Sequence, residues 1–249
     1  MAVITIKDLS LDKRLKSIHL DLQEGEVLGL IGPNGAGKTS LLHCLAGIES
    51  FQGEILLKQQ PLKTFSDTAR ARRLGLLPQG SQSAWSLRVR DVISLGRLPW
   101  QDEDPAKIVA AAELTGVDQW MNHLVDQLSG GEQLRVWLAR VFAGEPEILL
   151  ADEPLASLDL YYQCRVLSLL RDYVKARPEG KASRSVMVSL HDLSMAARYC
   201  DRLCLLHQGR VWSLGRPDEV LTQQNLLDVY QVNCQIDLNA VPPVVSVLG

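Results

Sequence analysis

The sequence predicts a doubly wound α/β fold, joined to a small antiparallel β subdomain and an inserted helical subdomain. Short runs that are apolar at every residue, with helical segments between them, indicate a parallel sheet covered by helices on both faces. Alternation of apolar and polar residues near the N-terminus is typical of half-buried antiparallel strands. Apolar residues at helical spacing fill the stretch between Gly80 and Pro146 and indicate the helical insert.

The first elements follow in order from these patterns. Residues 3–9 and 18–22 alternate and predict an antiparallel pair of strands. The run Val27–Ile31 is apolar on both faces and predicts a central parallel strand. Residues 39–46 then predict a helix that ends near a glycine, and residues 53–57 return to strand.

The second half of the chain has the rhythm of a βαβ unit. Two apolar runs, 148–151 and 186–189, flank the helical segment 161–175, so they predict neighbouring parallel strands. A polar loop is expected at 177–185. Residues 203–207 and 211–214 predict a closing hairpin around Gln208-Gly209-Arg210. We expect one domain, 1–249, with a core of 1–79 and 147–249 and a helical subdomain of 80–146.

Composition excludes several classes of protein. The chain has 249 residues, and 26 Lys+Arg against 29 Asp+Glu give a net charge of −3, which argues against a nucleic-acid partner held by phosphate charge. No stretch of about 18 apolar residues predicts a membrane span, and the N-terminus does not resemble a secretory signal. Five cysteines without a C-x-x-C pair fit reduced thiols in the cytosol.

A phosphate-binding loop is predicted between the strand ending at Ile31 and the following helix. The residues that match G-x-x-x-x-G-K-[ST] are Gly32, Pro33, Asn34, Gly35, Ala36, Gly37, Lys38 and Thr39. Backbone N–H groups of such a loop surround phosphate oxygens, Lys38 contacts the β- and γ-phosphates, and the hydroxyl of Thr39 reaches Mg²⁺. We therefore expect ATP or GTP here, against the alternative of a glycine-rich turn that binds nothing.

Two carboxylates follow the apolar strand Ile148–Ala151. Because ligands collect at the carboxyl ends of parallel strands, we expect Asp152 to hold Mg²⁺ and Glu153 to activate the attacking water. The alternative is an acidic pair that is merely solvated. His191 follows the strand 186–189 in the same way and is expected at the same sheet edge as Glu153. The remaining histidines have no such placement.

A second anion cradle is predicted at the start of the helix that runs through Arg135 to Arg140. It consists of Ser129, Gly130, Gly131 and Glu132. Alone, this pattern is a helix-capping sequence. One nucleotide rarely needs two cradles, so a head-to-tail dimer, in which one subunit's second cradle meets the γ-phosphate held by its partner, explains both.

Together these motifs resemble the ATP-binding subunit of ATP-binding-cassette (ABC) transporters. Leu128–Glu132 resembles the family signature, 32–39 the Walker A loop and 148–153 the Walker B strand. The resemblance implies a P-loop NTPase (RecA-like) core and an ATPase with ATP and Mg²⁺ as its ligands. Further roles that it implies are nucleotide contacts by Ser40 and Asp159, a D-loop at 157–159, a Q-loop Gln79 that touches Mg²⁺ and water, and a switch His191.

Other segments are similar to ATPases of bacterial iron-siderophore, haem and cobalamin importers, namely Leu95-Gly96-Arg97-Leu98-Pro99 and the stretch from Leu190 to Leu221. That resemblance implies a second copy of the chain, a permease dimer docked on the helical subdomain and the Gln79 region, and indirectly a substrate-binding protein. It places the chain peripherally on the cytoplasmic side of the bacterial inner membrane. A soluble ABC ATPase of cofactor assembly and an ATPase of another transporter class remain alternatives.

Two features depart from or extend the family pattern. No aromatic residue precedes Phe51, so the ring that usually stacks on adenine in this family is missing, and we hypothesise that an aliphatic or guanidinium group within 11–14 replaces it. Four tryptophans fall in or beside the helical subdomain, and each either packs in its core or contacts the permease. They are Trp85, Trp100, Trp120 and Trp137.

Overall fold

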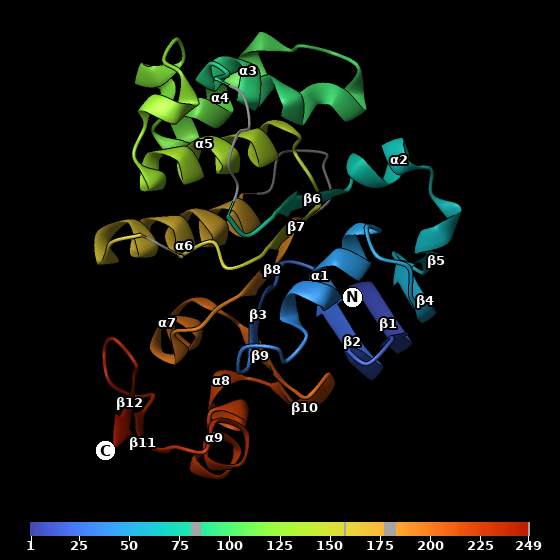
Figure 1. Cartoon of the computed structure of the whole chain (residues 1–249), viewed down its shortest axis with the longest axis vertical. Coiled ribbons are helices and arrows are strands. Elements are labelled where there is room, and N and C mark those ends of the chain that lie inside the picture. Colours follow the sequence, from blue (N-terminus) through green and yellow to red (C-terminus); the bar gives the residue numbers. More distant parts are fainter. Residues whose placement is uncertain (81–85, 157, 177–182, 249) are drawn as a thin grey trace. The chain divides into compact units, whose positions relative to one another are not determined.

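The computed structural model describes residues 1–80, 86–156, 158–176 and 183–248 (Figure 1). The chain forms two compact units, Met1–Thr64 with Ser185–Gly249, and Phe65–Arg184. The expected subdomain limits at 80 and 146 fall inside the second unit and remain predictions. Ser157 of the expected D-loop, Trp85, and most of the expected polar loop at 177–185 lie outside the described residues.

An antiparallel sheet forms the start of the first unit, as predicted. Its strand order is β2-β1-β4-β5. The bounds are β1 Ala2–Leu11, β2 Leu15–Gln23, β4 Gln52–Leu57 and β5 Gln60–Pro61. Leu9, Ile18 and Leu22 are fully buried. Register shifts between β1 and β2, one of them between Ile6 and Leu9, interrupt the alternation of buried and exposed residues. The short β5 ends at Pro61 and leads directly into the 3₁₀ turn η1 Leu62–Thr64.

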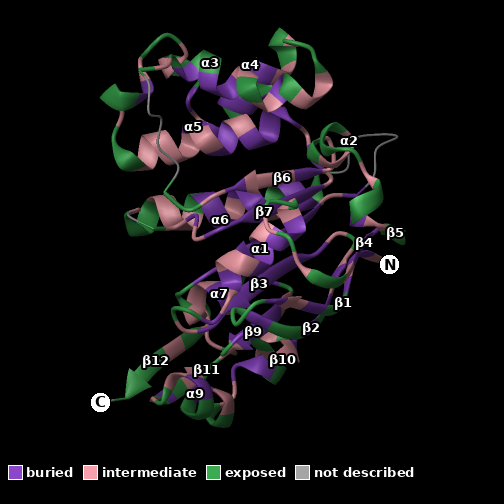
Figure 2. Ribbon diagram, turned by 45° about the vertical axis from the view of Figure 1, so that its right-hand side comes forward, coloured by how far each residue is buried: buried purple, intermediate pink, exposed green. Residues whose placement is uncertain are grey.

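The parallel strands of the first unit carry its chemistry. β3 (Val27–Ile31) pairs in parallel with β8 (Ser185–Ser189) and with β9 (Arg202–His207), and β10 (Arg210–Gly215) closes the predicted hairpin against β9. Every residue of β3 and β8 is buried, as expected for strands covered on both faces (Figure 2). Helix α1 (Lys38–Ala46) follows β3 and ends at Gly47.

The C-terminal part of the first unit is helical and then returns to strand. Its helices are α7 Leu193–Tyr199, α8 Pro217–Val220 and α9 Gln223–Tyr230, and its last sheet is the antiparallel pair β11 Asn233–Asp237 and β12 Val244–Leu248. The hydroxyl of Ser194 in α7 accepts a hydrogen bond from the N–H of Val245 at 2.9 Å and so ties β12 to α7.

The second unit combines two parallel strands with helices. β6 (Leu74–Leu77) pairs with β7 (Ile148–Ala151), and all four residues of β7 are buried. The α-helices are α2 Asp67–Ala71, α3 Val89–Ser94, α4 Pro105–Thr115, α5 Gly130–Ala143 and α6 Leu160–Lys175. The 3₁₀ turns are η2 Leu95–Trp100, η3 Asp118–Trp120 and η4 Val125–Gln127.

Helices dominate the stretch between β6 and β7, as predicted. α5 packs against both α3 and α4 (Figure 1). Trp100, Trp120 and Trp137 are each half-buried, so none is a fully enclosed core residue. The indole N–H of Trp100 donates to the carbonyl of Gly144 at 3.0 Å, which gives that ring a place in the packing of the helices. In the part of the chain described, none of the helices combines the length and apolar character needed to cross a membrane.

Candidate functional site

The loop between β3 and α1 has the geometry of a phosphate cradle. It leaves the C-terminal end of β3 at Gly32, whose φ is +143°. A Cβ on Gly32 would overlap the backbone carbonyl oxygen of Leu206, which cannot move away as a side chain could. Glycine is therefore required where the loop turns against β9.

The start of α1 is arranged to receive an anion. α1 has no acidic residue in its first turn, and among the described residues no side chain caps it at Gly37. Free N–H groups and the positive end of the helix dipole favour a negatively charged ligand at this position. The half-buried Thr39 and Ser40 lie in that first turn. The residues present therefore fit a polyphosphate.

The ammonium group of Lys38 lies inside its own loop. The side chain is buried, and Nζ donates to the carbonyls of Gly32 at 2.8 Å and Pro33 at 3.3 Å. These carbonyls hold a positive charge within the curve of the loop. Exchange of carbonyl oxygens for phosphate oxygens would keep the charge solvated and pair it with an anion.

Contacts from distant segments support the same loop, and the sequence patterns gave no sign of them. The N–H of Gly209 in the β9–β10 turn donates to the carbonyl of Ala36 at 3.1 Å, and the N–H of Lys16 donates to the carbonyl of Gly209 at 2.8 Å. Burial raises the pKa of Tyr230 at the end of α9 to about 12, against the effect of a hydrogen bond from the Gly32 backbone. Tyr230 therefore stays neutral and accepts from the first glycine of the loop.

His191 emerges beside the phosphate loop's strand. β8 lies parallel to β3 in register, with Leu30 opposite Ser189, and the N–H of Leu190 donates to the carbonyl of Leu30 at 3.0 Å. His191 is exposed immediately after this bond. The carboxylate of Asp192 caps α7 by accepting from the N–H of Met195 at 2.8 Å. The sheet thus brings His191 and the phosphate loop to one edge of the first unit.

The predicted carboxylates lie at the corresponding edge of the second unit. β6 and β7 are in register, and the N–H of Asp152 donates to the carbonyl of Leu77 at 2.9 Å. Asp152 is only 1% exposed, whereas Glu153 is half-buried. Glu153 has a φ of +47°, a left-handed backbone conformation that costs a non-glycine residue about 1 kcal/mol. Glu153 thus lies in a turn conformation two residues after the end of β7 at Ala151.

Gln79 contacts Glu153 directly. Its amide Nε2 donates to Oε2 of Glu153 at 2.6 Å, across 74 positions of sequence. A short hydrogen bond from a neutral amide orients a carboxylate without neutralising its charge. The structure thus brings these two predicted site residues together.

The second cradle is a complete capping box. Oγ of Ser129 accepts from the N–H of Glu132 at 3.4 Å, and the Glu132 carboxylate accepts from the N–H of Ser129 at 2.8 Å. The backbone N–H of Ser129, followed by its hydroxyl, holds the pKa of Glu132 below its usual range. The capping interpretation of this motif is thus realised. A Cβ on Gly130 would have nothing within 4 Å, whereas a Cβ on Gly131 would lie 3.1 Å from Cδ2 of Leu158.

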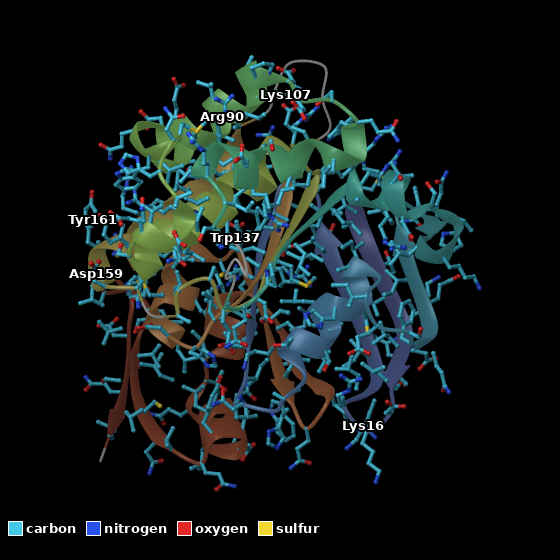
Figure 3. All side chains as sticks on the ribbon, turned by 45° about the horizontal axis from the view of Figure 1, so that its top comes forward. Lys16, Arg90, Lys107, Trp137, Asp159 and Tyr161 are labelled. Atoms are coloured by element: carbon cyan, nitrogen blue, oxygen red, sulfur yellow. The ribbon has the colours of Figure 1, made fainter. Side chains whose placement is uncertain are left out.

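Asp159 also caps a helix. Its carboxylate accepts from the N–H of Tyr162 at 2.9 Å and so begins α6. Figure 3 shows Asp159 and Tyr161 together at this exposed helix start, where Tyr161 is 66% exposed. Asp159 therefore has a local structural role, and its side chain lies at the surface of the second unit.

Comparison with known proteins identifies the family. The profile described as ABC transporter matches residues 15–156, more than half of the chain. The chain is 39% identical over 246 residues to the hemin import ATP-binding protein HmuV of Bordetella avium, with 92% of each chain covered. It is 43% identical over 228 residues to HmuV of Pseudomonas aeruginosa, covering 87% of this chain and 86% of that one.

Further similarities extend to another relative and to solved structures. The cobalamin import ATP-binding protein BtuD of Halobacterium salinarum is 36% identical over 239 residues, 94% of this chain and 59% of the relative. A metal-chelate type ABC transporter in an inward-facing conformation has the same fold, with a TM-score of 0.83, 23% identity, and coverage of 100% of this chain and 97% of that chain. The chain belongs to the ABC transporter family, as an ATP-binding subunit.

Proposed function

We propose that this ATPase hydrolyses MgATP to drive the import of a metal chelate of the haem or cobalamin kind through a membrane permease. The observation that carries the catalytic part is the hydrogen bond from Gln79 to Glu153, because it orients the Glu153 carboxyl group next to the buried Asp152. The names of the relatives support the transport part, since two of them at 39% and 43% identity are hemin import proteins.

The nucleotide would be held by the residues from Gly32 to Ser40. Lys38 would leave the carbonyls of Gly32 and Pro33 for the β- and γ-phosphates, and the α1 N-terminus would add its dipole. Thr39, Gln79 and Asp152 provide the hydroxyl, amide and carboxylate oxygens that suit Mg²⁺. Mg²⁺, when bound, neutralises the charge that develops on the phosphate oxygens.

Hydrolysis would depend on Glu153 as the general base. Its carboxylate would accept a proton from the attacking water while Gln79 fixes its direction, and His191 would contact the γ-phosphate. The Lys38 charge would stabilise the transition state in addition to binding the nucleotide. Catalysis by positioning and charge needs no covalent intermediate.

A second copy would complete each site. We propose a head-to-tail homodimer in which Ser129, Gly130, Gly131 and Glu132 of one chain face the γ-phosphate bound by the other, with Asp159 at the seam. The exposed Asp159 and Tyr161 support this arrangement because they leave a surface for a partner. The permease dimer would dock on the helical region and near Gln79, which places the chain on the cytoplasmic face of the inner membrane, and a substrate-binding protein would supply the cargo.

Glu153→Gln tests the catalytic proposal. The variant should lose about 100-fold or more in ATP hydrolysis, because the amide cannot take the proton, while MgATP affinity stays within about threefold. Glu103→Gln, at an exposed position outside the site, removes the same charge and should match the parent protein. Hydrolysis by Glu153→Gln at the parental rate would show that another group is the base.

The cargo is tested by transport. The ATPase, copurified with its permease and reconstituted in liposomes, should take up haem or cobalamin only with ATP inside. Uptake of neither, with ATP hydrolysis intact, would refute the metal-chelate assignment. The ATPase proposal would stand in that case.

A further inference from the structure

Arg135 in α5 is held between two aromatic rings. Its guanidinium carbon lies 5.0 Å from the ring centre of Trp120 in η3 and 4.9 Å from that of Tyr162 in α6. All three side chains are half-buried, so the stacking is partly shielded from water. A guanidinium about 5 Å from two ring centres can interact with both rings, and it links three segments of the second unit.

The edge of the same guanidinium contacts a helix end. NH1 of Arg135 donates to the carbonyls of Gly116 at 3.1 Å and Thr115 at 3.4 Å, where α4 ends. A cation at this position also meets the negative end of the α4 dipole. Within the described part of the chain, buried Nε of Arg135 has no hydrogen-bond partner, so its faces and NH1 carry the contacts.

Arg135 is coupled to the signature motif. It follows the capping-box residue Glu132 on the same helix, and its charge is one of the influences that lower the pKa of Glu132. On the same helix turn, Gly131 approaches Leu158 so closely that a Cβ on the glycine would lie 3.1 Å from the leucine Cδ2. The start of α5 therefore packs directly on the segment that precedes α6.

Tyr162 is coupled to the expected D-loop in turn. Its backbone N–H donates to the carboxylate of Asp159 at 2.9 Å, within the first turn of α6. The ring that stacks on Arg135 thus belongs to the turn that Asp159 caps. Movement of α6 relative to α5 would break the stacking and the Gly131–Leu158 contact together.

We propose that Arg135 is a positioning residue, which holds the signature motif and the Asp159 turn as one rigid surface for the partner chain. The inference rests on the proposed two-site dimer. A role confined to packing would lower stability alone. Positioning for the partner instead predicts a defect in ATP-driven dimerisation, because the signature completes the pocket of the other chain, with no loss of nucleotide affinity in the monomer.

The test uses the full chain with Glu153→Gln as the background. ATP-driven dimerisation is measured by analytical ultracentrifugation, and MgATP affinity is measured at protein concentrations too low for dimers. The variants are Arg135→Gln, Arg135→Lys, Tyr162→Leu and Tyr162→Phe. Arg165→Gln, which removes the same charge from an exposed position of α6, is the matched control.

We expect Arg135→Gln, Arg135→Lys and Tyr162→Leu to weaken dimerisation about tenfold, since each removes planar stacking. Tyr162→Phe keeps the ring and should restore the parental value. Arg135→Gln combined with Tyr162→Leu should be no worse than either alone, because both break one contact. Monomer affinity for MgATP should remain unchanged.

The inference is overturned if the dimerisation constant of Arg135→Gln lies within twofold of the parental value. It is also overturned if the monomer of this variant loses affinity for MgATP to the same extent. If Arg135→Gln does not fold, the Tyr162 pair decides, because failure of Tyr162→Leu to differ from Tyr162→Phe overturns it equally. A background protein that stays monomeric with saturating MgATP would instead refute the proposed dimer, and this inference with it.

Discussion

Gln79→Glu perturbs the contact on which the proposed chemistry rests. In the parent protein a neutral amide donates to Glu153 at 2.6 Å. The substitution keeps the side-chain length and places a second carboxylate at that distance. The two negative charges repel each other, which favours protonation of one of the two carboxylates. The pair therefore keeps a proton up to a higher pH than Glu153 does in the parent protein.

The size of the effect follows from the distance. At 2.6 Å the repulsion of two unit charges is about 1.6 kcal/mol in a fully aqueous dielectric, equivalent to roughly one pH unit. The aqueous value sets the lower limit of the effect, because Gln79 is exposed whereas Glu153 is half-buried. The added negative charge favours protonation of the pair. On acidification, the variant therefore loses its active, ionised form at a higher pH than the parent protein does.

The assay is the pH dependence of ATP hydrolysis. For Gln79→Glu, the midpoint of the acidic limb should move up by about one pH unit relative to the parent. Gln79→Ala serves as the control because it removes the hydrogen bond and adds no charge, so its midpoint should move much less. Coincident acidic limbs for the parent and Gln79→Glu would show that the two side chains do not meet during turnover.

Three further predictions concern the phosphate loop, the segment 11–14 and the second cradle. Gly32→Ala should destabilise the protein by about 2 kcal/mol or more and abolish ATP binding, since its Cβ meets the Leu206 carbonyl; calorimetry and a binding assay check both. Arg14→Ala should weaken ATP binding about threefold and leave inorganic tripolyphosphate binding unchanged if its guanidinium stacks on the base, and equal ATP affinity would refute that role. Glu132→Gln should lower the melting temperature near neutral pH, because the ionised carboxylate accepts from the N–H of Ser129. The difference from the parent protein should vanish as the pH falls through the lowered pKa of Glu132. A difference that persists in acid would contradict the charge argument.

Much of the fold could be predicted from local pattern. The buried run Val27–Ile31 could only be a strand covered on both faces, and the glycine-rich loop after it could only turn toward a helix. The alternation in 3–9 and 18–22 likewise gave the antiparallel pair β1 and β2. These predictions succeeded because periodicity and turn chemistry act over a few residues.

The contacts within the site could not be predicted in this way. Nothing in the sequence near Gly32 indicates that Tyr230 would reach its backbone, or that Gly209 would donate to Ala36. Arg135 lies in an ordinary helical pattern, and its place between Trp120 and Tyr162 depends on how three segments pack. Sequence patterns do not predict such contacts, because each of these residues could have many different neighbours.

The sequence by itself determined which residues we expect to bind phosphate and Mg²⁺, because the motif fixes the types of donor and their spacing on one loop or strand end. The tertiary structure alone decided how those groups are held before any ligand arrives. Lys38 on its own loop carbonyls and Gln79 on Glu153 are examples. Their geometry comes from strand register and helix packing, in which residues 74 positions apart come within 2.6 Å.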